Sequence, residues 1–88
     1  MYQIIGEYLE YLELEKGLSQ NTIDAYRRDL SDFAQEIDNI QAITRMTINT
    51  YVRSLRDRNL APTSVIRKVA SLRGFFKWAT SSGIIEQN

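Results

Sequence analysis

The sequence predicts an all-α fold, a bundle of four helices, from its hydrophobic spacing and its turn residues. Apolar residues recur at intervals of three and four along four segments of the 88-residue chain, which is the period of helices with one buried face. Pro62, Gly17 and Gly83 lie at or between the ends of these segments, where helices begin or stop. Short connections between such helices favour a single compact core.

Two helices are predicted in the first half of the chain, over residues 2–16 and 20–37. Gly17 is suited to end the first because glycine readily adopts the left-handed conformation of a C-cap, and Ser19 is suited to cap the second. The apolar stripes that we expect to be buried are Ile5, Tyr8, Leu9 and Leu12 in the first helix, and Ile23, Tyr26, Leu30, Phe33 and Ile37 in the second.

Two further helices are predicted after a loop at residues 38–44. Thr47 is the expected cap of the third, which runs to about Arg58. The fourth runs over residues 62–81, opens on Pro62, whose missing N–H would be unpaired anyway, and ends before Gly83. The residues that we expect to be buried are Ile48, Tyr51, Val52 and Leu55 in the third helix, and Val65, Val69, Leu72, Phe76 and Ala79 in the fourth.

The composition restricts the chemistry that the chain can perform. It contains no Cys and no His, so it lacks disulfides, thiolate ligands and the commonest metal ligand and general base. We therefore expect no catalytic residue, metal or cofactor, and we expect Glu13 and Glu15 to be solvated. No apolar run approaches the length of about 18 residues that spans a bilayer, and the acidic start is unlike a signal peptide. The sequence therefore predicts one soluble, cytoplasmic domain over residues 1–88.

Charge is divided unevenly along the chain although its formal total is zero. Residues 1–40 hold nine acids and three bases, a net of −6, whereas residues 41–88 hold eight bases and two acids, a net of +6. A basic side could neutralise phosphates whatever the total charge. The alternative is that the two halves attract each other within a soluble bundle, and charge alone favours this interpretation.

The fourth helix is predicted to expose a basic, hydroxyl-rich face opposite its apolar stripe. Thr63, Arg67 and Ser71 recur there about one turn apart, with Ser64 and Lys68 beside them, and residues 61–85 contain no acid. Arg and Lys bind phosphates or guanine edges, and small hydroxyl residues allow a helix start to approach phosphate closely. The face therefore suits a DNA major groove, with an ordinary solvated surface as the alternative.

The second helix begins with a similar run of polar residues, 19–22, whose first backbone N–H groups are free to bind phosphate. Beyond it, Ala25 and Arg28 lie on the exposed side. The acids Asp24, Asp29 and Asp32 would repel DNA if they approached it, so we expect contact to weaken along the helix. Simple capping by Ser19 is the alternative. The beginnings of the second and fourth helices are expected to lie side by side.

Aromatic residues on the stripes are predicted to belong to the core, whereas Phe75 and Trp78 lie off the main stripe. These two could cover the edge of the bundle or pack against a following domain. Arg73 and Lys77, with Ile66 on the same flank, could contact the phosphate backbone or that domain. The aromatic residues expected in the core are Tyr8, Tyr26, Phe33, Tyr51 and Phe76.

Two long segments resemble the core-binding domain of tyrosine recombinases of the phage-integrase and Xer type. Residues 15–33, EKGLSQNTIDAYRRDLSDF, resemble the opening helix pair of that domain. Residues 55–85, LRDRNLAPTSVIRKVASLRGFFKWATSSGII, resemble its closing segment, with a turn, a Ser/Thr-rich helix start, a Leu-Arg pair and an aromatic cluster. The resemblance covers nearly the whole chain in the same order and spacing.

The resemblance implies an orthogonal, SAM-like four-helix bundle that forms one half of a clamp around duplex DNA at a recombination core site. A separate catalytic domain, absent from this chain, would close the clamp and supply the nucleophilic tyrosine, so no tyrosine of this chain is a nucleophile. The acids of the N-terminal half and the zero net charge predict weak DNA binding by this domain alone. The residues that we expect to bind DNA are Ser19, Asn21, Thr22, Ala25, Arg28, Thr63, Ser64, Arg67, Lys68 and Arg73.

Two partners follow from the resemblance, double-stranded DNA and other recombinase subunits, because such recombinases act as tetramers on DNA. The chain alone is expected to be monomeric. The alternative function is a protein-interaction module, in which the acidic first helix and residues 75–78 dock partner subunits during assembly.

Overall fold

The computed structural model of the chain describes residues 1–37 and 39–86. In this part of the chain it contains four α-helices, one short 3₁₀ helix and no strand, which confirms the predicted all-α bundle. The elements in chain order are α1 (Tyr2–Glu15), α2 (Gln20–Ala34), η1 (Ile40–Ala42), α3 (Arg45–Asp57) and α4 (Pro62–Ser81).

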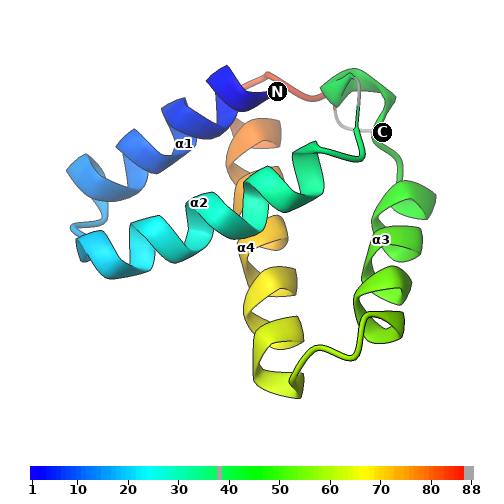
Figure 1. Cartoon of the computed structure of the whole chain (residues 1–88). Coiled ribbons are helices and arrows are strands. Elements are labelled where there is room, and N and C mark those ends of the chain that lie inside the picture. Colours follow the sequence, from blue (N-terminus) through cyan, green and yellow to red (C-terminus); the bar gives the residue numbers. More distant parts are fainter. Residues whose placement is uncertain (38, 87–88) are drawn as a thin grey trace.

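The helices form two crossed pairs (Figure 1). α1 and α2 run antiparallel as a hairpin, and α4 passes steeply across both of them. α3 runs beside α4 in the opposite direction. In this crossed arrangement, α4 contacts each of the other three helices.

The turn between α1 and α2 forms as predicted. Gly17 adopts a φ of 64°, which a residue with a side chain rarely adopts, and the backbone N–H of Leu18 donates to the Leu12 carbonyl. Ser19 then accepts a hydrogen bond from the Thr22 backbone N–H at 3.3 Å, the bond of an N-cap. Gly83, at a φ of 77°, follows the end of α4 in the same way.

Two predicted boundaries are wrong. α2 ends at Ala34 instead of residue 37, because the N–H groups of Glu36 and Ile37 each bond three residues back and tighten the last turn. The cap of α3 is Thr44, not Thr47, and the two threonines bond reciprocally as a capping box, so α3 starts at Arg45. The predicted loop between them contains η1, and its first residue, Asp38, lies outside the described residues.

The core contains most of the predicted stripe residues. The expected side chains that are fully buried are Ile5, Tyr8, Leu9, Leu12, Ile23, Leu30, Phe33, Tyr51, Leu55, Leu72 and Ala79. Those expected in the core that are only half-buried are Tyr26, Ile37, Ile48, Val52, Val65, Val69 and Phe76.

Phe75 is the clearest correction, because it lies off the predicted stripe and yet has no exposed surface. Its ring meets Tyr8 of α1 at 5.6 Å and Phe76 at 5.4 Å between centroids, both edge-to-face. Trp78 covers the α1–α4 edge, with its ring 5.3 Å from Tyr8 and 6.3 Å from Tyr11. α4 thus buries two faces, one under α1 and one toward α2 and α3, and a single stripe underestimates its core.

None of the helices in residues 1–37 and 39–86 combines the length and hydrophobicity that a bilayer-spanning segment needs.

Candidate nucleic-acid interface

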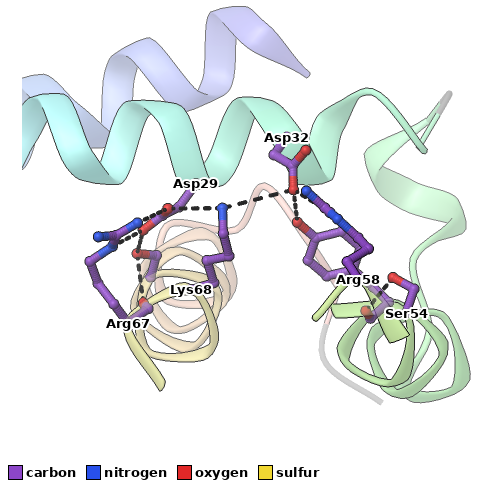
Figure 2. Close-up of polar contacts among 8 residues, drawn as sticks. Asp29, Asp32, Ser54, Arg58, Arg67 and Lys68 are labelled. Carbon is purple, nitrogen blue, oxygen red and sulfur yellow. Dashed lines mark hydrogen bonds and ion pairs between the residues drawn. The ribbon is translucent and has the colours of Figure 1, made fainter. Parts of the chain in front are cut away.

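α2 and α4 are joined where they cross by a buried carboxylate (Figure 2). Asp29 of α2 is only 2% exposed, and Oδ2 and Oδ1 accept hydrogen bonds from Arg67 Nε and Nη2, both at 2.9 Å. Lys68 Nζ donates to Oδ1 at 3.2 Å. The Ser71 hydroxyl lies 3.0 Å from Oδ2 and 3.0 Å from the Arg67 carbonyl, and donates to these acceptors. We call these four residues the Asp29 cluster.

The electrostatics of the Asp29 cluster keep the carboxylate ionised. Burial alone would raise the pKa of Asp29, but the hydrogen bonds from Arg67, Ser71 and Lys68 outweigh it and hold that pKa below its ordinary value. A buried charge is tolerated only when it is paired and hydrogen-bonded, and Asp29 accepts four hydrogen bonds from three side chains. The cluster therefore fixes how α2 and α4 cross.

A second carboxylate joins α2 to α3. Asp32 Oδ2 accepts hydrogen bonds from the Tyr51 hydroxyl at 2.5 Å and from Arg58 Nη1 at 2.9 Å. Burial would raise the pKa of Asp32, but these bonds lower it on balance. Lys68 Nζ lies 3.9 Å from the same oxygen and so stands between the two carboxylates, as Figure 2 shows. Three helices are therefore linked by one chain of ion pairs.

This geometry corrects the expected surface of α2 and α4. Asp29 and Asp32, which would repel DNA if they approached it, point into the bundle toward positive partners, and the half-buried Asp24 pairs with Arg27 at 2.9 Å. Ser71, expected on the exposed face, is 1% exposed because α2 covers it. The repulsion that we expected along α2 is thus largely compensated at short range.

The predicted DNA-binding residues at the start of α2 are accessible. Asn21 is exposed and Thr22 is half-buried, while the Ser19 hydroxyl donates to Thr22 Oγ1 at 3.1 Å in addition to capping the helix. Ala25 is half-buried, and Arg28 is exposed one turn further on. The capping role of Ser19 is therefore real and leaves room for a ligand on Asn21.

The start of α4 is open to solvent. Ala61 precedes the helix and has no side chain that could cap it, and Thr63 is exposed beside the half-buried Ser64. The first N–H groups of α4 thus lack a side-chain acceptor among the described residues. Arg67 keeps 43% of its side chain exposed, whereas Lys68 keeps only 13%.

The two helix beginnings do not lie side by side, which corrects our expectation. α2 and α4 meet near Asp29, in the middle of α2, and their N-terminal halves extend from this crossing in different directions (Figure 1). The structure brings Arg67 and Lys68 together with α2, but it leaves the start of α2, which contains Asn21, apart from the start of α4, which contains Thr63. Arg73 is exposed further along α4, beside Ile48 and Val69.

Residues 5–83 match the family model of the phage integrase N-terminal SAM-like domain. The chain belongs to this family. Tyrosine recombinase XerD of Staphylococcus haemolyticus is 42% identical to this SAM-like domain over 84 residues, which are 90% of the chain and 28% of that protein.

Other relatives of this SAM-like domain give the same picture. Tyrosine recombinase XerC of Listeria innocua is 33% identical over 91 residues, 98% of the chain and 30% of that protein. Tyrosine recombinase XerC of Xylella fastidiosa is 29% identical over the full chain and 32% of that protein. The chain thus spans less than a third of the length of these relatives. No solved structure gives a significant match.

The position of Asp29 in the sequence of this SAM-like domain carries a signal of its structural role, which was not predicted. Asp29 lies three residues after Tyr26 and four before Phe33, so it shares the side of α2 that carries the apolar stripe. A carboxylate at such a position must find a cation from elsewhere in the fold.

Across the described residues, no group of three or more acidic, Cys or His side chains is placed to hold a metal ion.

Proposed function

We propose that this SAM-like domain binds duplex DNA at a recombination core site, as one half of the clamp of a tyrosine recombinase. The observation that carries the proposal is the first half of α4, where Thr63 and Arg67 are exposed, the helix start lacks a side-chain cap, and no acid occurs in residues 61–85. Helix N-termini and arginines both favour phosphate oxygens.

The ion pairs of α2 support the proposal. A carboxylate that already has a cation within hydrogen-bonding distance repels a nearby phosphate less than a free one does, because the two charges form a dipole. Asp24, Asp29 and Asp32 each have such a partner. The N-terminal half of α2 can therefore approach DNA despite its acids, with Asn21 and Arg28 exposed on it.

Two of the five tyrosines, Tyr8 and Tyr51, have the properties of core residues and not those of a nucleophile. Tyr8 is buried in the core, and burial, together with Tyr26 and Tyr11, raises the pKa of its hydroxyl to about 12. Burial and the hydrogen bond to Asp32 raise the pKa of Tyr51 as well. A nucleophilic hydroxyl must instead be accessible and activated by a base. We propose that the strand-cleaving tyrosine of the parent recombinase lies in a separate domain.

Fluorescence anisotropy with a labelled duplex tests the proposal. Non-specific duplex binding has a Kd of about 1 to 100 µM at physiological salt and weakens linearly with the logarithm of salt concentration. We expect this domain to fall at the weak end of that range because its net charge is zero. Anisotropy that does not change over this range, even at about 50 mM salt, contradicts the proposal.

Thr63→Asp separates folding from binding in this assay, because we expect it to stabilise the fold and to weaken DNA binding. An acid in the first turn of α4 stabilises the helix by about 0.3 to 1 kcal/mol through the helix dipole. The same acid should repel phosphate and weaken duplex binding. Thr50→Asp, at an exposed position of α3, adds the same charge away from the proposed surface and should leave binding nearly unchanged.

The interaction-module alternative loses part of its basis in the structure. Phe75 is fully buried and Trp78 packs on Tyr8 and Tyr11, so this region of α4 is already occupied by α1. Assembly of the parent recombinase into tetramers with other subunits on DNA remains part of the proposal. Sedimentation of the 88-residue chain without DNA should give a monomer.

A further inference from the structure

The guanidinium of Arg67 is held by one edge only. Its Nε and Nη2 atoms donate to the two oxygens of Asp29, both at 2.9 Å, and this uses two of its five N–H donors. The adjacent edge, at the end of the guanidinium and formed by Nη1 and the second Nη2 hydrogen, makes no hydrogen bond to the described residues, and 43% of the side chain is exposed. Asp29 thus fixes the guanidinium along its Nε–Nη2 edge and leaves the Nη1–Nη2 edge without a hydrogen bond to the described residues.

The Asp29 cluster holds the carboxylate firmly in place. Asp29 is 2% exposed and is held from two further sides by Lys68 and Ser71, so the carboxylate cannot turn away without leaving buried donors unpaired. A free arginine loses much rotamer entropy when it binds, whereas one that is already fixed loses little. A planar pair of donors that is fixed in advance suits two adjacent acceptors.

We propose that Asp29 is a positioning residue, which holds Arg67 so that the outer edge of its guanidinium binds two adjacent acceptor atoms of duplex DNA. This inference rests on the proposed function. Two groups of the duplex present such acceptors: the oxygens of one phosphate, and the O6 and N7 atoms of a guanine in the major groove. Lys68 does not share this role, since only 13% of its side chain is exposed and its Nζ lies between Asp29 and Asp32.

The inference makes a prediction opposite in sign to that of simple electrostatics. Asp29→Asn removes one negative charge, so charge alone predicts tighter binding to DNA. If Asp29 positions Arg67, the same change releases the guanidinium and weakens binding by about fivefold or more. Asp24→Asn is the matched control, because it removes the same charge from a half-buried position of α2 where 43% of the side chain is exposed, and it should bind as tightly as the unchanged protein or more tightly.

Arg67→Lys provides a second, independent variant. It keeps the positive charge but cannot present a planar pair of donors. We expect it to weaken binding to nearly the same degree as Arg67→Ala. Arg45→Ala, at an exposed position where α3 starts beside the end of α4, controls for loss of an arginine elsewhere.

Anisotropy titrations of these variants, on two duplexes of equal length rich in G·C or in A·T pairs, decide the inference. Equal losses on both duplexes identify a phosphate as the acceptor, and a larger loss on the G·C duplex identifies guanine. The inference is overturned if Asp29→Asn binds as tightly as Asp24→Asn, or if Arg67→Lys binds like the unchanged protein.

Folding and the proposed function are tested separately. Circular dichroism establishes at which temperature Asp29→Asn is folded, and if it is unfolded throughout, Arg67→Lys alone decides. In the unchanged protein, the Arg67 Nε–H signal should persist with little shift when duplex is added, because its bond to Asp29 is kept; loss of that signal contradicts the inference. If the unchanged protein does not bind duplex at all, the proposed function has failed instead.

Discussion

Replacing Asp29 by Asn should destabilise this domain far more than an equivalent change at its surface. The change keeps the size of the side chain but removes the charge that Arg67 and Lys68 share, and it turns one acceptor into a donor facing donors. Removing one partner of a buried ion pair costs about 3 to 5 kcal/mol. Asp29 is buried and its three partners come from α4, so we expect a loss within that range.

The size of this loss is large for so small a domain. At about 0.05 to 0.15 kcal/mol per residue, a chain of 88 residues has a total stability of about 4 to 13 kcal/mol. The variant should therefore lose between about a quarter and all of its stability. Asp24→Asn is again the matched control, because its pair with Arg27 is exposed on both sides and such pairs contribute about 0 to 1 kcal/mol.

Urea unfolding followed by circular dichroism measures both variants. The expected result is a lower midpoint for Asp29→Asn with an unchanged slope, and a midpoint for Asp24→Asn close to that of the unchanged protein. If the two variants lose the same stability to within about 1 kcal/mol, the carboxylate of Asp29 does not hold the crossing, and the reasoning is refuted.

Three further predictions concern the packing and the second carboxylate. Gly74→Ala places a Cβ 2.5 Å from the Tyr8 hydroxyl and should lower the stability by about 1 to 3 kcal/mol. Gly6→Ala, whose Cβ meets nothing within 4 Å, should stabilise α1 by about 0.5 to 1 kcal/mol. Thermal unfolding compares the two variants, and equal midpoints contradict the packing. Tyr51→Phe removes the hydrogen bond to Asp32 and should cost about 1.5 to 3 kcal/mol in urea unfolding, a value near zero counting against that bond. The folded pKa values of Asp29 and Asp32 lie below the ordinary 3.8, so their contribution to the free energy of unfolding is complete well above pH 3.8 and is lost as the pH falls through the lowered values. Unfolding midpoints should therefore drop on acidification, and less steeply in Asp32→Asn. An equal dependence of the midpoint on pH in that variant would contradict the assignment.

Local signals in the sequence predict most of the helices correctly. Gly17, Ser19, Pro62 and Gly83 act at the ends where their backbone chemistry places them. The start of α3 was mispredicted, because Thr44 and Thr47 both carry hydroxyls that can cap a helix and each bonds the other. The apolar stripe of α3 begins only after Thr47, because Arg45 and Met46 are exposed and do not belong to it, so Thr47 was predicted as the cap.

Contacts between helices could not be predicted in the same way. Asp29 and Arg67 are 38 positions apart, and helical periodicity describes only one helix at a time. The face of α4 opposite its stripe was therefore interpreted as solvent-exposed, although α2 crosses it at Ser71. Phe75 was misplaced for the same reason, because its burial depends on the packing of α4 against α1. The residues at the starts of α2 and α4 were predicted as exposed, and Asn21 and Thr63 are.

The central claim, that this domain holds duplex DNA on α2 and the first half of α4, is tested most directly by nuclear magnetic resonance. A ¹⁵N-labelled sample is titrated with duplex DNA at low salt and again at higher salt. We predict shifts at Asn21, Arg28, Thr63 and Arg67 that diminish as salt rises, with little change along the acidic face of α1. Shifts confined to α1, or a spectrum that DNA leaves unchanged, would contradict it.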